Sequence, residues 1–137
     1  VASGIKSVVV TGGEPLMWNL DYLCRALKEN GVSTFLETSG AYPLSGEWDW
    51  ICLSPKRNMP PGKDICTKAD ELKVIIEESG DFEWAEKYRR QVRGNTHLFM
   101  QPEWSRFEAV IPVITDYIIK NPVWRISLQI HKYMHIP

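Results

Sequence analysis

Hydrophobic and polar positions follow two different periods along the chain, and the switches between them predict a series of strands and helices. Short apolar and β-branched runs predict six strands, at residues 7–11, 32–37, 48–53, 72–76, 96–100 and 124–130. Apolar residues at helical spacing predict at least three helices between those strands. Strands that alternate with helices favour right-handed crossovers, so we expect an α/β fold with a mostly parallel sheet.

The three predicted helices have their own start and stop signals. Asn19 can cap the first, which ends at Gly31; the second covers residues 81–92. Ser105 can cap the third, where Pro112 should kink the helix or delay its start. The predicted inward faces are Leu20, Leu23, Cys24 and Leu27 in the first helix, Phe82, Ala85 and Tyr88 in the second, and Phe107, Val110, Ile111, Ile114 and Ile118 in the third.

The first strand leads into Thr-Gly-Gly-Glu-Pro at residues 11–15. A continuous apolar run bounded by glycines predicts a strand buried on both faces. Two glycines let the backbone approach a ligand closely, Glu14 adds a carboxylate, and Pro15 fixes the turn. A tight turn without a ligand is the alternative interpretation of such a short motif.

Polar clusters follow five of the six predicted strands. They lie at residues 11–15, 37–40, 54–56, 101–103 and 129–132. In a barrel or part-barrel, the carboxyl ends of the strands converge on one mouth, where active sites of that architecture lie. The five clusters therefore predict a single ligand site.

Composition narrows the class of protein. The 137 residues, 44% of them hydrophobic, suffice for one domain, 1–137, with a real core. A net charge of -1 gives no basic field for nucleic acid or an anionic membrane, and the apolar runs are too short to span a bilayer. Three cysteines without a C-x-x-C pair indicate reduced thiols in a cytoplasmic protein. Because the chain starts at Val1 with a ligand-facing strand, we expect its amino-terminal part to be missing.

The motifs resemble, in chain order, those of the 7-carboxy-7-deazaguanine synthase family within the radical S-adenosylmethionine superfamily. They are Thr-Gly-Gly-Glu-Pro at 11–15, Glu-Thr-Ser-Gly at 37–40, Ser-Pro-Lys at 54–56, Ala-Asp-Glu-Leu-Lys at 69–73, Gln-Pro-Glu at 101–103 and Trp-Arg-Ile-Ser-Leu-Gln-Ile-His-Lys at 124–132. Gly-Gly-Glu-Pro alone would indicate only the superfamily. The closing segment, with its near-terminal proline, is what makes the resemblance specific.

The resemblance implies an incomplete TIM-like barrel of the radical SAM type and a carbon-nitrogen lyase of queuosine biosynthesis. Members use a [4Fe-4S] cluster to cleave S-adenosylmethionine, and the resulting radical starts the ring contraction of 6-carboxy-5,6,7,8-tetrahydropterin with loss of ammonia. Magnesium is a further cofactor, and flavodoxin or ferredoxin is the expected reductant. Such chemistry belongs largely to the cofactor, so no catalytic side chain is assigned to this segment.

The same resemblance assigns residues to the two ligands. The S-adenosylmethionine set is Gly12, Gly13, Glu14, Pro15, Thr38, Ser54, Lys56 and Gln101. The substrate set is Thr11, Glu37, Gln129, His131 and the terminal Pro137, whose carboxylate can pair with an aminopyrimidinone edge.

The sequence departs from the family pattern in two places. Ile130 replaces a threonine, which removes a hydroxyl, and the cluster-binding Cys-x-x-x-Cys-x-x-Cys motif is absent. Cys24, Cys52 and Cys66 are predicted on a helix, a buried strand and a distant loop, so they do not replace it. His131 and His135 have i, i+4 spacing, but a metal pair needs a helix that a strand exit does not favour. No metal ligand is therefore assigned to this chain, and the segment alone should be inactive.

Two alternatives remain open at this point. One is an activating enzyme for anaerobic ribonucleotide reductase or pyruvate formate-lyase, which shares Gly-Gly-Glu-Pro but should lack the closing signature. The other is a cluster-free module that binds a different ligand in a similar pocket. A homodimer is a further option, because Trp48, Trp50, Trp84 and Trp104 would mark an interface if they were exposed.

Overall fold

The computed structural model describes residues 4–134, and of His131 only the backbone. Six strands form one sheet in which every pair of neighbours is parallel and the spatial order is the chain order. The strands are β1 Ser7–Val10, β2 Ser33–Thr38, β3 Trp50–Leu53, β4 Glu71–Ile76, β5 His97–Pro102 and β6 Trp124–Ile126. The expected α/β fold with a parallel sheet of six strands is confirmed.

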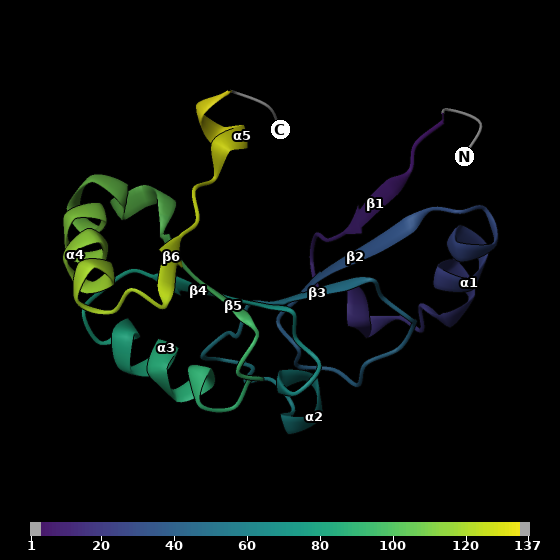
Figure 1. Ribbon diagram of the computed structural model, residues 1–137, viewed down its shortest axis with the longest axis horizontal. Helices are drawn as coiled ribbons and strands as arrows, with labels where there is room; N and C mark the ends of the chain where they lie inside the picture. The colour runs from purple at the N-terminus through teal and green to yellow at the C-terminus, as the bar shows by residue number, and fades with distance from the viewer. Residues whose placement is uncertain (1–3, 135–137) are drawn as a thin grey trace.

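The helices lie mainly on one side of this sheet. They are η1 Pro15–Met17, α1 Asp21–Glu29, α2 Lys63–Cys66, α3 Asp81–Arg89, η2 Trp104–Arg106, α4 Phe107–Lys120 and α5 Ile130–Tyr133. Helices α1 to α4 follow the outer, convex side of the curved sheet, and α5 lies on the other side, beyond β6 (Figure 1). The inner side therefore lacks a covering helix layer over most of its area within the described chain.

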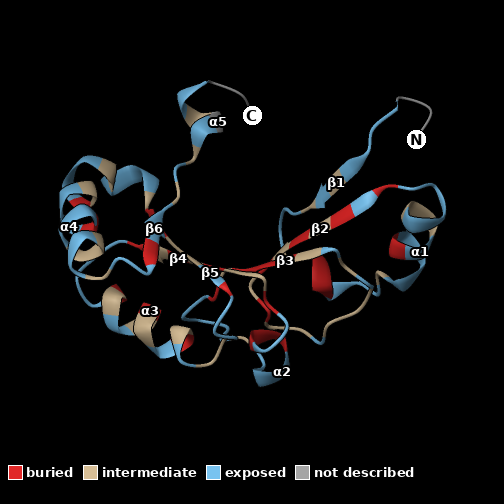
Figure 2. Ribbon diagram, in the orientation of Figure 1, coloured by how far each residue is buried: buried red, intermediate tan, exposed pale blue. Residues whose placement is uncertain are grey.

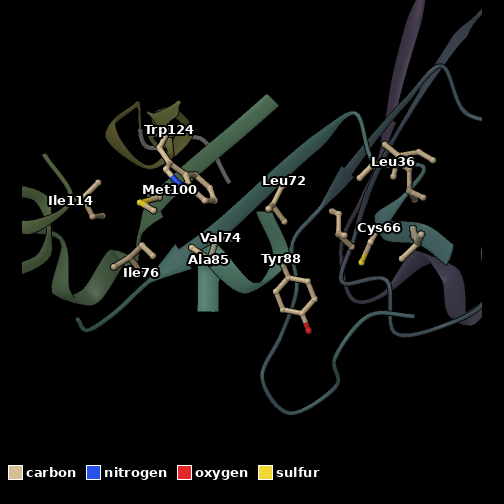
Figure 3. Close-up of a cluster of buried hydrophobic side chains, with 14 of the residues drawn as sticks. Leu36, Cys66, Leu72, Val74, Ile76, Ala85, Tyr88, Met100, Ile114 and Trp124 are labelled. Carbon is tan, nitrogen blue, oxygen red and sulfur yellow. The ribbon is translucent and has the colours of Figure 1, made fainter. Parts of the chain in front are cut away.

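The core lies between the sheet and these outer helices. In β4, Leu72, Val74 and Ile76 are buried and face the helices, whereas Glu71 and Lys73, at alternate positions of the same strand, face the opposite side. Figure 2 shows the buried residues concentrated in the central strands and on the inward faces of the helices. Figure 3 shows the buried side chains contributed by the strands and helices, among them Leu36, Met100, Ala85, Tyr88, Ile114 and Trp124. The alternation along β4 separates an apolar face from a polar one.

The prediction that the first strand is buried on both faces is wrong. Val9 is 55% exposed, and Ser7 is exposed as well. The physical reason is position: β1 pairs only with β2 and lies at the edge of the described sheet. A run of β-branched residues predicts a strand, but it does not say how many neighbours the strand has.

Two strand boundaries differ from the prediction at functionally relevant places. The third strand starts at Trp50 rather than at residue 48, because Asp49 Oδ2 accepts a hydrogen bond from the backbone of Thr34 at 2.8 Å and turns the chain into the sheet. The last strand ends at Ile126 instead of 130. Ser127 N donates to Met100 O at 2.8 Å, after which the chain leaves the sheet.

Ile130, the last residue of the predicted strand, instead begins α5, a single turn of helix at Ile130–Tyr133. This segment is therefore not a strand exit, and its local structure gives no ground for excluding a helical His131–His135 pair. The His131 side chain and all of His135 lie outside the described residues.

Two helices also differ from expectation. Helix α4 begins at Phe107 and runs through Pro112 without a delayed start, and Arg106, not Ser105, is its cap residue. Ser105 belongs to η2, where its hydroxyl donates to Glu103 Oε2 at 2.5 Å. Cys66, expected in a loop, ends the short helix α2. Within the described residues, none of the helices has the length and apolar character needed to cross a bilayer.

Candidate cofactor and substrate site

A pocket of about 570 Å³ lies at the carboxyl ends of the strands, on the sheet face opposite the apolar core. Its walls include residues that follow β1, β2, β3 and β6, together with side chains of β4 and β5. The lining residues are Thr11, Gly13, Glu14, Glu37, Thr38, Ser39, Ser54, Lys56, Asn58, Met59, Glu71, Lys73, Ile75, Gln101, Ser127, Leu128 and Gln129. This is the position in which parallel α/β folds bind their ligands.

The turn after β1 brings bare backbone to the pocket. Gly12 and Gly13 have φ of 84° and 51°, a conformation that costs residues with a Cβ about 1–2 kcal/mol each. No heavy atom beyond their chain neighbours lies within 4 Å of a Cβ built on either residue. Pro15 then starts η1 and is buried, so it fixes the turn from behind and does not line the pocket.

The Glu14 carboxylate ties this turn to the end of β2. Its Oε1 accepts hydrogen bonds from Leu16 N at 3.1 Å and Thr38 Oγ1 at 2.5 Å, and its Oε2 accepts from Ser39 N at 2.8 Å and from the Ser39 hydroxyl. Burial raises the pKa of Glu14, but these hydrogen bonds outweigh it and the net pKa is lowered. Four bonds occupy the acceptor capacity of a carboxylate. The side chain therefore holds the turn, and backbone groups remain for a ligand.

The pocket floor contains a charged cluster on the inner face of β2, β3 and β4. Lys73 Nζ lies 3.1 Å from Glu37 Oε2, and the Cys52 thiol donates to Glu71 Oε1 at 3.3 Å. Burial lowers the pKa of Lys73, but the charges of Glu37 and Glu71 and the hydrogen bond to Glu37 raise it overall. The floor thus presents an ionised lysine between two glutamates.

Lys56 stands at the pocket mouth, in the loop that follows β3. Desolvation by the surrounding walls and the charge of Lys73 lower the pKa of Lys56, whereas Glu14 raises it, and the net pKa is lowered. Among the described residues Lys56 makes no ion pair within 4.0 Å. Its ammonium group is available to an anionic ligand.

The structure brings together most of the residues that the sequence singled out. Nine of them line the one pocket: Thr11, Gly13, Glu14, Glu37, Thr38, Ser54, Lys56, Gln101 and Gln129. Gly12 and Pro15 belong to the same turn but do not line the pocket. The His131 side chain and Pro137 lie outside the described residues.

Sequence reasoning missed the contribution of β4. Its residues Glu71, Lys73 and Ile75 line the pocket from within the strand, whereas the polar residues 77–79 that follow it do not line the pocket. The alternation of polar residues with Leu72, Val74 and Ile76 was the available signal, because it marks a strand with one polar face. Asn58, Met59, Ser127 and Leu128 also line the pocket and were not predicted.

The cysteines do not fit an iron-sulfur cluster. Cys24, Cys52 and Cys66 lie on α1, β3 and α2, and each is buried, with at most 4% exposure. Burial raises the pKa of each thiol, which opposes the thiolate form that a cluster requires. No group of three His, Cys, Asp or Glu residues within the described part of the chain is arranged to hold a metal ion. The described residues therefore supply no ligand set for the cluster.

Comparison with known proteins identifies the family. Three curated 7-carboxy-7-deazaguanine synthases are similar to this chain. The one from Flavobacterium psychrophilum is 51% identical over 96% of this chain and 63% of the relative, and the one from Synechocystis sp. is 50% identical over 94% of this chain and 62% of the relative. The one from Prochlorococcus marinus is 37% identical over 98% of this chain and 70% of the relative. A crystal structure of QueE from Escherichia coli superimposes with a TM-score of 0.80 at 27% identity, covering 90% of this chain and 57% of that one. No family model matches the chain.

The chain thus spans less than two thirds of the length of the two relatives that are about half identical to it. The similarity nevertheless covers nearly all of its own 137 residues, including every strand that contributes to the pocket. The chain belongs to the 7-carboxy-7-deazaguanine synthase family.

Proposed function

We propose that this chain is the carboxyl-terminal portion of a radical S-adenosylmethionine enzyme that converts 6-carboxy-5,6,7,8-tetrahydropterin into 7-carboxy-7-deazaguanine with loss of ammonia. The observation that carries the proposal is the convergence of both predicted ligand sets on one pocket of about 570 Å³. A pocket of this size falls within the usual range for a bound small molecule. Family membership supplies the reaction.

The methionine end of S-adenosylmethionine needs acceptors for its ammonium group and a donor for its carboxylate. Backbone carbonyl groups of the Gly12–Gly13 turn can supply the first, because no side chain stands between this turn and the pocket. Lys56 supplies the second, with Ser54 beside it. Glu14 acts indirectly, since its carboxylate is occupied in holding the turn against β2.

The pterin substrate fits the polar floor and the opposite wall. The Glu37 carboxylate is an acceptor-only group that can pair with the two donors of an aminopyrimidinone edge. Lys73 orients that carboxylate through the 3.1 Å contact. Thr11 and Gln129 line the same pocket, and we propose His131 and the terminal carboxylate of Pro137 as further substrate ligands.

The cluster and magnesium would be bound by residues other than those described here. When bound, the cluster and S-adenosylmethionine supply the radical that starts the reaction, and a flavodoxin or ferredoxin would supply the electron. The role of this chain is to bind and orient the two organic molecules and to exclude water from the reacting atoms.

The direct test uses the protein encoded by the complete reading frame that contains these residues, called the complete protein below. It is reconstituted with iron and sulfide under anaerobic conditions and given S-adenosylmethionine, reductant and the pterin. We expect 7-carboxy-7-deazaguanine and 5′-deoxyadenosine, measured by mass spectrometry. Cofactor cleavage without pterin binding would favour an activating enzyme, and a complete protein without cluster or turnover would favour a binding module.

A second test uses the 137-residue polypeptide under the same conditions. We expect no 5′-deoxyadenosine, because its cysteines are buried and dispersed over three elements. Measured cofactor cleavage by this polypeptide would contradict the assignment of the cluster ligands to other residues.

A further inference from the structure

The loop that carries Lys56 has few internal constraints. It covers residues 55–61 and joins β3 to α2. At its ends, Ser54 N donates to Thr38 O at 2.8 Å and Gly62 N donates to Gly40 O at 3.0 Å. Between these two points, no backbone hydrogen bond joins the loop to the described part of the chain. A loop that positions a charged group at a pocket therefore needs another attachment.

Arg57 provides that attachment. Its Nε and Nη2 donate to Asp81 Oδ1 at 3.2 and 2.6 Å, and Nη2 also donates to Gly80 O at 3.3 Å. The guanidinium carbon lies 5.1 Å from the centre of the Trp84 ring. Within the described chain, the side chains of residues 55–61 make no other hydrogen bonds. The hydrogen bonds and the ring contact of Arg57 are all with residues at the start of α3.

The partner of Arg57 is itself fixed. The Asp81 side chain is only 9% exposed, and its second oxygen, Oδ2, accepts hydrogen bonds from Glu77 N at 2.8 Å and Glu78 N at 3.0 Å. Burial raises the pKa of Asp81, but the bonds from Arg57 and from the two amides lower it overall. Asp81 therefore connects Arg57 rigidly to the end of β4 and the first turn of α3.

The two neighbours of Arg57 in the chain, Lys56 and Asn58, both line the pocket, whereas Arg57 does not. Holding the Arg57 side chain on the α3 side thus determines where Lys56 and Asn58 project on the other side. We propose that Arg57, Asp81 and Trp84, called the α3 clamp, are positioning residues that place Lys56 for the carboxylate of S-adenosylmethionine. This proposal rests on the function proposed above.

The chain contains a matched control for the α3 clamp. Arg93 Nη2 donates to Asp70 Oδ1 at 2.7 Å and also to the backbone oxygens of Lys68 and Ala69. Asp70 Oδ2 accepts a hydrogen bond from Ile51 N at 2.9 Å, just as the second oxygen of Asp81 accepts from backbone amides. This ion pair lies at the amino end of the sheet and does not line the pocket.

The first measurement does not depend on a ligand. Limited trypsin digestion of the complete protein is followed by mass spectrometry at the bonds after Lys56 and Arg57, in wild type, Asp81→Asn and Asp70→Asn. Releasing Arg57 from α3 opens the loop, so the rate of this cleavage should rise about tenfold in Asp81→Asn. Asp70→Asn should leave it unchanged.

The second measurement is binding of S-adenosylmethionine by equilibrium dialysis, together with steady-state constants for both ligands. Arg57→Ala should weaken cofactor binding about tenfold, the loss of one well-placed charged contact, with the pterin KM unchanged. Arg93→Ala should lower the thermal midpoint as much as Arg57→Ala does. It should change neither the affinity for S-adenosylmethionine nor the pterin KM.

Each outcome bears on one proposal. Equal effects of Arg57→Ala and Arg93→Ala on cofactor binding would make the α3 clamp a stability element and overturn the inference. Equal cleavage rates in Asp81→Asn and Asp70→Asn would overturn it as well, even if the ligand were different. Wild-type protein that fails to bind S-adenosylmethionine would overturn the proposed function, while the digestion still decides whether the clamp holds the loop.

Discussion

Lys73 Nζ and Glu37 Oε2 lie 3.1 Å apart across the pocket floor, although β3 separates their strands. Cys52 on β3 pairs with Glu37 on one side and with Glu71 on the other, so Lys73, two residues beyond Glu71, reaches diagonally across β3. The Lys73 side chain is 14% exposed and the Glu37 side chain is 43% exposed, so the lysine is largely covered and the glutamate is accessible from the pocket. The cation thus fixes an acid that we assign to the substrate.

Replacing Lys73 by Met keeps the apolar length of the side chain and removes its charge. Glu37 and Glu71 then lose their cation, so the free energy of unfolding should fall by about 1–3 kcal/mol. Pterin binding should weaken about tenfold, because Glu37 is no longer held in place. Urea unfolding and equilibrium binding with the complete protein measure both. The control is Lys28→Met, which breaks an exposed pair with Glu47 at 2.8 Å and should leave the urea midpoint nearly unchanged.

The pH dependence of that pair has a definite sign. Because the folded-state pKa of Lys73 is raised above 10.5, its contribution is fully present below pH 10.5 and is lost as the pH rises through the higher folded value. The stability difference between wild type and Lys73→Met should therefore be constant from pH 7 to about 9 and shrink above 10.5. A difference that is already lost at pH 8 would contradict this.

Glu14→Gln should loosen the turn after β1. An amide keeps one acceptor oxygen and presents an NH2 group to donors, so hydrogen bonds from Thr38 and Ser39 are lost at a cost of about 1–3 kcal/mol. Since the folded pKa of Glu14 is lowered below 4.5, the wild-type advantage exists above pH 4.5 and disappears as the pH falls through the folded value. Urea unfolding at pH 7 and in steps below pH 5 measures this, with Glu29→Gln on the exposed side of α1 as the control.

Gly40→Ala should be among the most damaging single changes. A Cβ there would lie 2.7 Å from Leu53 Cδ1 and 2.8 Å from Ile65 Cγ2, at a φ of +74°. The left-handed backbone and the overlap together predict a loss of about 2–5 kcal/mol. Gly31→Ala, at a φ of +67° with no atom within 4 Å of the Cβ, should lose only the backbone part, about 1–2 kcal/mol. Thermal unfolding of the two variants compares them, and equal losses would contradict the predicted overlap.

Tyr133→Ala should release α5 from the rest of the chain. Tyr133 makes edge contacts with Trp104 and Phe107 at centroid distances of 5.1 and 5.8 Å, and Lys132 Nζ lies 5.0 Å from the centre of the Trp104 ring. Because α5 includes His131, the pterin KM should rise about threefold to tenfold with little change in the cofactor KM. The control is Tyr22→Ala, an 81% exposed aromatic residue on α1, which should change neither constant. Equal increases in both constants would argue against a substrate-specific role of α5.

The order and type of the main elements could be predicted because each strand and each of the three long helices has its own local pattern. Leu72, Val74 and Ile76 alternate with polar residues, and Phe82, Ala85 and Tyr88 recur at helical spacing, so the buried faces follow from the chain alone. Local patterns did not predict the burial or the length of a strand where these depend on neighbouring strands. Val9 is exposed because β1 has one partner, and residues after Ile126 leave the sheet because their last backbone bond is to Met100.

In the candidate site, too, the sequence predicted some features and the tertiary structure decided the others. The sequence by itself determined that Gly12, Gly13, Ser54 and Lys56 follow strands and that Glu37 lies at the end of one, and parallel strands place such residues at one edge. Only the tertiary structure decided what each side chain does there. It occupied the Glu14 carboxylate with four internal hydrogen bonds and brought Lys73 to Glu37 across β3. It also attached Arg57 to Asp81, 24 residues away. Periodicity describes neighbours along one chain, whereas these contacts depend on the distances between strands and helices that the sheet brings together.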